Sequence, residues 1–160
     1  ATAIKKELAP PNAIESAIQS MARLNKDTAE ILREYNINAV TDVTGFGLLG
    51  HLKEMCEGSD VSAEIQFSQL KFLPSVIELA ESGIIPGGTK RNLNYLKKYI
   101  SFDKKIDQTQ RLLAADAQTS GGLLVSMPMS EAEIFIDKTN ESSFIIGRIK
   151  EVKSSIIKVL

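Results

Sequence analysis

The chain has 160 residues, of which 43% are hydrophobic and 24% are charged, so we expect one globular domain over residues 1–160. Its 19 Lys and Arg against 20 Asp and Glu give a formal net charge of -1, which excludes the bulk positive field that drives nucleic-acid binding. No apolar run approaches the roughly 20 residues of a membrane-spanning helix, and residues 1–11 lack the apolar centre of a signal peptide, so we expect a cytoplasmic protein without membrane contact.

Apolar periodicity and turn residues predict helices and strands that intermingle without strict alternation. In chain order, the pattern predicts helix 12–24, helix 28–35, strand 39–43, a glycine loop to residue 47, helix 48–57, strand 61–67, helix 74–82, loop 84–92, helices 92–99 and 105–114, strand 123–127, helix 130–138, and strands 144–149 and 155–159. Ser130 and Glu133 fit a capping box for the last helix, and the last two strands should be neighbours through a turn over residues 150–154. The expected fold class is α+β, a layered α/β sandwich with a mixed sheet.

The segment 41–51, with the sequence TDVTGFGLLGH, places a carboxylate at a strand end, then two glycines, then a helix start. Backbone N–H groups and the positive end of the helix can approach an anion there, which favours a phosphate beside Thr44, Gly45 and Gly47. Asp42 is placed to meet a Mg²⁺ ion carried by that phosphate, since this ion prefers one or two carboxylates plus phosphate oxygens. An alternative stays open: Asp42 and Thr44 cap the helix, and the glycines only turn the chain.

Gly45, Gly47 and Gly50 also spell G-x-G-x-x-G, with Glu64 near the distance of a ribose partner. This dinucleotide interpretation requires a buried strand of a deep parallel sheet before the first glycine. The polar strand end around Asp42 argues against it. The chain has no G-x-x-x-x-G-K-[ST] sequence, which excludes a Walker-type phosphate loop.

Two further glycine clusters occur at 83–92 and 116–122. We interpret the second as a packing segment, and the first as a loop that either touches an anion or is simply solvated. His51 is the one histidine and is expected to be a hydrogen-bonded structural group. Cys56 is the one cysteine, which excludes an internal disulfide, and we expect a buried, inert thiol.

In order and spacing, the 41–51 segment, the Pro86-Gly87-Gly88-Thr89 loop with Asn92, and the segment DAQTSGGLL at 116–124 resemble the selenophosphate synthetases (selenide, water dikinases). This family belongs to the superfamily of aminoimidazole ribonucleotide synthetase, whose second domain is a layered α/β unit resting against an amino-terminal dimerisation domain. The resemblance implies a reaction in which ATP, selenide and water give selenophosphate, AMP and phosphate. It also implies that Asp42 is a magnesium ligand and that Thr44, Gly45 and Gly47 lie near the phosphates.

The resemblance covers essentially the whole chain, but only the carboxyl-terminal half of the family's protein. It implies that the catalytic Cys or selenocysteine and Lys lie in the absent amino-terminal domain, so no catalytic residue is expected here and the fragment should be inactive. The full-length protein should be a homodimer. Ala1 should begin after the first strand of the family's second domain, which would expose a sheet edge. The alternatives are a stand-alone nucleotide-binding or scaffold module, or another ATP-using enzyme of the superfamily.

Overall fold

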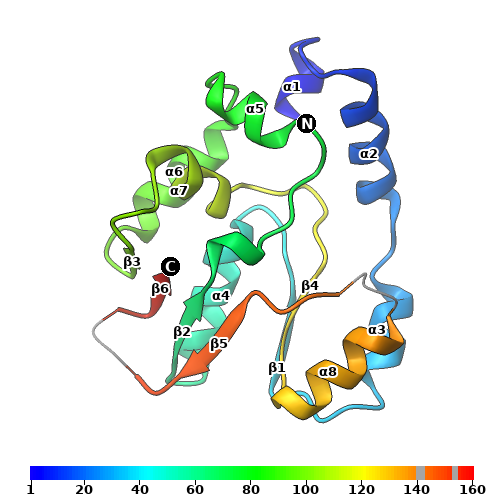
Figure 1. Cartoon of the computed structure of the whole chain (residues 1–160), viewed down its shortest axis with the longest axis vertical. Helices are drawn as coiled ribbons and strands as arrows, with labels where there is room; N and C mark the ends of the chain where they lie inside the picture. The colour runs from blue at the N-terminus through cyan, green and yellow to red at the C-terminus, as the bar shows by residue number, and fades with distance from the viewer. Residues whose placement is uncertain (140–142, 153–154) are drawn as a thin grey trace.

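The computed structural model describes residues 1–139, 143–152 and 155–160 (Figure 1). Its elements, in chain order, are α1 (Thr2–Lys5), α2 (Pro11–Ala22), α3 (Lys26–Leu32), β1 (Ala39–Asp42), α4 (Gly47–Gly58), β2 (Ser62–Ile65), the 3₁₀ helix η1 (Phe67–Gln69), α5 (Val76–Glu81), α6 (Gly87–Leu96), β3 (Ile100–Phe102), α7 (Gln108–Ala114), β4 (Leu123–Ser126), α8 (Met129–Lys138), β5 (Gly147–Lys150) and β6 (Ile157–Val159). No described helix has the length and apolar character needed to cross a membrane. The mixture of helices and mixed sheets confirms the predicted fold class.

The described strands form two separate sheets. β1 and β4 make an antiparallel pair in which Asp42 lies opposite Leu123. The other sheet has the order β3-β6-β2-β5, with β6 parallel to both β3 and β2 and with β5 antiparallel to β2. Helix α4 connects the two sheets, because it follows β1 along the chain and packs against β2 and β6 as well as β1.

The core lies between α4 and the four-stranded sheet. Leu49, Leu52 and Cys56 of α4 repeat at helical spacing and are at most 3% exposed. Ile157 and Val159 of β6 face them in the same apolar cluster and are fully buried. Each such aliphatic side chain contributes about 1.5–3 kcal/mol on burial, so this layer is what orients α4.

The start of α6 corrects one prediction. Residues 87–92 were expected in a loop, but α6 begins at Gly87, directly after Pro86 in the extended cap position. Glycine has a low helix propensity, so two glycines at the start of a helix were not expected. A Cβ at Gly88 would lie only 3.0 Å from the Cβ of Ala117, so a larger residue there would be crowded. Close packing of the helix against the 116–122 segment therefore outweighs the local propensity.

Two other predictions, on the pairing of the last two strands and on the cap of the last helix, were wrong. β5 and β6 are not neighbours, because β2 lies between them; part of the proposed connecting turn, residues 153–154, lies outside the described residues. Helix α8 begins at Met129 without a side-chain cap, since Pro128 occupies the boundary position. A capping box instead starts α7, where Asp107 and Gln110 bond each other's backbone N–H groups.

Candidate functional site

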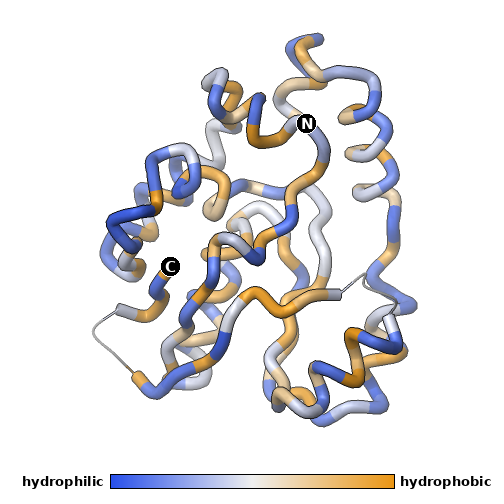
Figure 2. The backbone as a smooth tube through the Cα atoms, viewed as in Figure 1, coloured by the Kyte–Doolittle hydropathy of each residue, from blue (hydrophilic) through white to orange (hydrophobic). Residues whose placement is uncertain are grey.

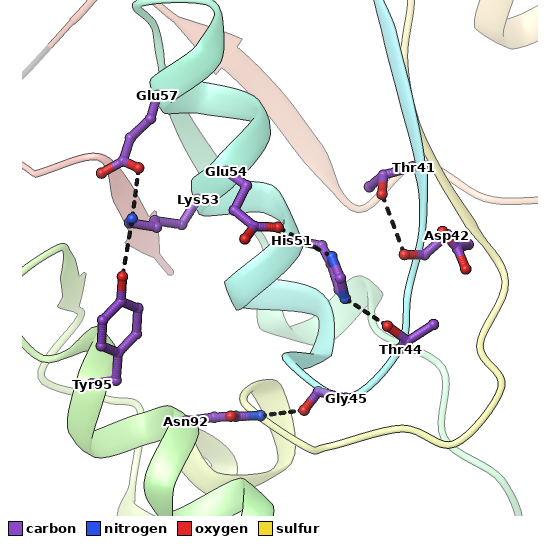
Figure 3. A network of polar contacts seen from close by, with 10 residues as sticks. All are labelled: Thr41, Asp42, Thr44, Gly45, His51, Lys53, Glu54, Glu57, Asn92 and Tyr95. Carbon is purple, nitrogen blue, oxygen red and sulfur yellow. Dashed lines mark hydrogen bonds and ion pairs between the residues drawn. The ribbon is translucent and has the colours of Figure 1, made fainter.

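The three glycine segments that the sequence singled out meet at the amino-terminal end of α4. The Asn92 side chain of α6 donates a hydrogen bond to the Gly45 carbonyl at 2.9 Å, as Figure 3 shows. The Gly121 N–H donates to the Val43 carbonyl, also at 2.9 Å. Segments separated by some 45 to 80 residues along the chain thus form one junction around the loop that joins β1 to α4.

Two glycines of this junction are explained by backbone contact. Gly47 has a φ of +70°, and a Cβ added there would lie 2.3 Å from the Asp116 carbonyl oxygen. A Cβ at Gly121 would lie 2.5 Å from the Val43 carbonyl oxygen. By contrast, Gly45 is exposed and a Cβ there would meet nothing within 4 Å. Gly45 is therefore the loop glycine with open space beside it, and the packing interpretation of the 116–122 segment holds for Gly121.

Thr89 and Asp116 form the buried polar centre of the junction. The Thr89 hydroxyl donates to an Asp116 carboxylate oxygen at 2.7 Å and accepts the Ala117 N–H at 3.1 Å. Thr89 is only 1% exposed, and burial raises the pKa of Asp116 above its usual value while the Thr89 hydrogen bond acts against that rise. The sequence analysis placed Thr89 in a loop. Its role as the link between α6 and the 116–122 segment could not be read there, because it depends on a contact across 27 residues.

Thr44 contacts His51, one turn into α4. The Thr44 hydroxyl and the His51 Nε2 atom lie 3.1 Å apart, and the His51 Nδ1 atom lies 3.4 Å from a Glu54 carboxylate oxygen (Figure 3). The side chain of Thr44 therefore does not cap α4; its carbonyl accepts the Gly47 N–H instead. His51 is 9% exposed, which agrees with the expected structural histidine.

Asp42 ends β1 immediately before this loop. Its side chain is exposed and makes no hydrogen bond or ion pair with the residues that the structure describes. In the same described part of the chain, no group of three or more His, Cys, Asp and Glu is placed to hold a metal ion. The site thus offers one free carboxylate, which fits the mode in which Mg²⁺ takes one or two protein carboxylates and fills its other positions with phosphate and water.

A cleft between α4 and α6 borders the junction and was not foreseen from the sequence. It has a volume of about 320 Å³ and is lined by Phe46, Gly50, Lys53, Glu54, Arg91, Asn92, Tyr95 and Leu96. Lys53 is 7% exposed, donates to Glu57 at 2.6 Å and to the Tyr95 hydroxyl at 3.3 Å, and lies 4.4 Å from the centre of the Tyr99 ring. The hydrogen bond to Glu57 raises the pKa of Lys53, so this cation is fixed and joins α4 to α6.

The dinucleotide interpretation fails on the topology. Gly45, Gly47 and Gly50 do follow a strand and open a helix, but that strand is β1, one half of an antiparallel pair. The next strand, β2, belongs to the other sheet. A Rossmann fingerprint needs both strands side by side and parallel, so no βαβ unit surrounds these glycines.

Residues 5–159 match the profile of the family described as AIR synthase related protein, C-terminal domain. The chain belongs to this family. It is also similar to curated proteins named selenide, water dikinase: 42% identical over 154 residues to the one from Caldanaerobacter subterraneus subsp. tengcongensis, covering 94% of this chain and 44% of that protein. The protein of that name from Sulfurovum sp. is 41% identical over 165 residues, covering 99% and 46%, and the one from Aliarcobacter butzleri is 37% identical over 152 residues, covering 92% and 44%.

This AIR synthase related domain therefore spans a little less than half the length of the curated relatives it matches, and it corresponds to their carboxyl-terminal part. The match covers the β1–α4 loop, α6 and the 116–122 segment together. The resemblance inferred from these motifs is confirmed at the level of the family and its dikinase relatives.

Proposed function

We propose that this AIR synthase related domain is the carboxyl-terminal domain of a selenide, water dikinase, an enzyme that makes selenophosphate, AMP and phosphate from ATP, selenide and water. The observation that carries the proposal is the identity of 37–42% over nearly the whole chain to relatives of that name. The convergence of all three glycine segments on one loop supports it, because scattered motifs of a shared site should meet in space.

Within that enzyme, Asp42 would hold Mg²⁺ and the loop with Thr44, Gly45 and Gly47 would lie along the ATP phosphates. The bound ion would neutralise phosphate charge and orient the triphosphate. The loop itself has two parts with different tasks. Gly45 leaves room for an anion at the α4 amino terminus, whereas Gly47 allows the close approach to Asp116 that keeps the loop in place.

One carboxylate and backbone amides are too little to balance three phosphates, so the domain alone should be inactive. The remaining groups, including the catalytic Cys or selenocysteine and Lys, would come from the amino-terminal domain of the same polypeptide. We propose that this complete protein is a cytoplasmic homodimer that binds ATP and selenide.

The test is the activity of the full-length protein with Asp42→Asn, measured as ATP consumption and as selenophosphate formation at several magnesium concentrations. We expect a loss of roughly 100-fold or more, together with a higher magnesium requirement, because the amide lacks the charge that holds the ion. The matched control is Asp137→Asn, which changes another exposed carboxylate on α8 and should leave activity unchanged. Full activity of a folded Asp42→Asn protein would remove Asp42 from the site, and an unmodified protein that makes no selenophosphate would refute the dikinase assignment.

A further inference from the structure

Helix α2 leaves most of its apolar face uncovered. It is 12 residues long, and the one residue it buries is Ala13. Ile14, Ala17, Ile18 and Met21 recur at the spacing of one helix face. In Figure 2, hydrophobic positions recur along this helix, which runs at one side of the molecule away from both sheets. An amphipathic face of this kind is normally covered in the native protein.

The composition of this surface is that of an interface. Ile18 is 56% exposed, Met21 36% and the following Leu24 74%; with Ile14 they make up what we call the α2 face. A shallow hollow of about 490 Å³ lies against the same helix. Glu15 is the one charged residue in the helix, and depletion of charge marks the centre of interfaces. A helix of this length is marginal in water on its own, so a further contact along the α2 face would add to its stability.

We propose that the α2 face is the docking surface for the amino-terminal domain of the same polypeptide. This inference rests on the proposed function, which makes the chain one part of a two-domain enzyme. The relatives are more than twice as long as the segment matched here, so each carries a large further body of polypeptide. A covalently tethered domain has an effective concentration in the millimolar range, which lets it occupy the α2 face before a second molecule does.

Hydrogen bonds connect the end of α2 to the candidate site, which gives a functional reason for a domain to dock there. The Asn25 side chain, just beyond α2, donates to the Gly121 carbonyl at 3.2 Å. Gly121 in turn donates its N–H to Val43, the residue after Asp42. A domain held on the α2 face is thereby kept near the Asp42 carboxylate. This placement is what a site completed by two domains requires.

Thiol labelling of the full-length protein tests the proposal. Ile18→Cys places a probe on the α2 face, and Ile134→Cys is the matched control, because Ile134 is the same residue type in another helix and is 60% exposed against 56%. Cys56 serves as the internal reference, since it is fully buried and burial raises its pKa to about 11. Maleimide labelling is followed by mass spectrometry of the separated peptides, and each rate is divided by the rate of the same site in urea.

We expect the Ile18 site to label roughly tenfold more slowly than the Ile134 site in the native protein, with the two rates equal after unfolding. Leu24→Cys is a second probe of the α2 face and should behave as Ile18→Cys does. Equal native rates at the Ile18 and Ile134 sites would overturn the proposal.

Dilution separates the two possible kinds of partner. Protection by a tethered domain is independent of protein concentration, whereas protection that disappears on dilution would assign the α2 face to a second copy and overturn the proposal. Labelling does not require turnover. A protein that protects the Ile18 site but makes no selenophosphate would therefore refute the dikinase assignment while leaving the docking surface in place.

Discussion

Replacing Gly47 with alanine should destabilise the domain strongly, because the added Cβ is unfavourable for two separate reasons. The left-handed φ of +70° costs an L-residue about 1–2 kcal/mol. The new Cβ would also lie 2.3 Å from the Asp116 carbonyl oxygen and 3.1 Å from the Ala115 carbonyl oxygen. Both neighbours are backbone atoms, so relief requires movement of the α4 amino terminus or of the segment after α7.

The size of the loss follows from adding these penalties. Forcing an extra methyl group into a packed region costs about 1–3 kcal/mol, which with the backbone term gives about 2–5 kcal/mol. A domain of this kind has a total stability of about 5–15 kcal/mol, so Gly47→Ala should move the midpoint of urea unfolding far from that of the unmodified protein.

Gly45→Ala is the matched control in the same loop. A Cβ at Gly45 would meet nothing within 4 Å, and its φ is not in the left-handed region. We expect a change below about 0.5 kcal/mol. Urea unfolding followed by circular dichroism gives both values. If Gly47→Ala unfolds within 1 kcal/mol of Gly45→Ala, on the scale of ordinary surface substitutions, then the loop does not approach Asp116 as closely as described, and the packing argument is wrong.

Two further predictions concern the same junction. Thr89→Val keeps the shape of the side chain but removes the donor to Asp116 and the acceptor for the Ala117 N–H, so it should lower the free energy of unfolding by about 2 kcal/mol or more in urea titrations, while Thr89→Ser should lose less. A smaller loss for the valine variant than for the serine variant would contradict this account. Burial raises the pKa of Asp116 in the folded state above the ordinary value of 3.8. As pH rises from 3.8 to the folded value, the unfolded state loses its proton first, so the contribution of Asp116 to folding stability falls. Asp116→Asn should therefore gain stability relative to the unmodified protein as pH rises above 3.8, as read from thermal unfolding, and a difference that shrinks over this rise would refute the sign.

The sequence predicted best the elements whose burial follows a local period. Helix 48–57 was expected and α4 spans Gly47–Gly58, because Leu49, Leu52 and Cys56 mark its buried face at helical spacing. Strand 61–67 contains β2, although pairing ends at Ile65. The neighbours of β2 could not be predicted in the same way. Its pairing with β5 and β6 depends on contacts far apart in sequence, and the residues between β5 and β6 carry no signal that a third strand intervenes.

The candidate site was likewise predictable in its local motifs but not in its long-range contacts. Its motifs were recognisable because glycine and small polar residues are grouped in the sequence, but their contacts were not. The bonds of Asn92 to Gly45 and of Thr89 to Asp116 join residues 47 and 27 positions apart. Gly87 and Gly88 also misled the helix prediction, since a local propensity scale cannot register that Gly88 must pass close to Ala117.

These contacts separate structural from chemical roles within one motif. Gly47 and Gly121 are constrained by backbone atoms, and Thr44 is engaged by His51, so substitutions there should act first on stability. Asp42 and Gly45 face no such constraint within the described part of the chain, so substitutions there should leave the fold intact and act on the ligand. A full-length enzyme in which Asp42→Asn loses activity without losing stability, while Gly47→Ala loses both, is what this arrangement requires. If the two effects were exchanged, Gly47 would be the ligand contact and Asp42 the structural residue, and the assignment of the metal to Asp42 would have to be abandoned.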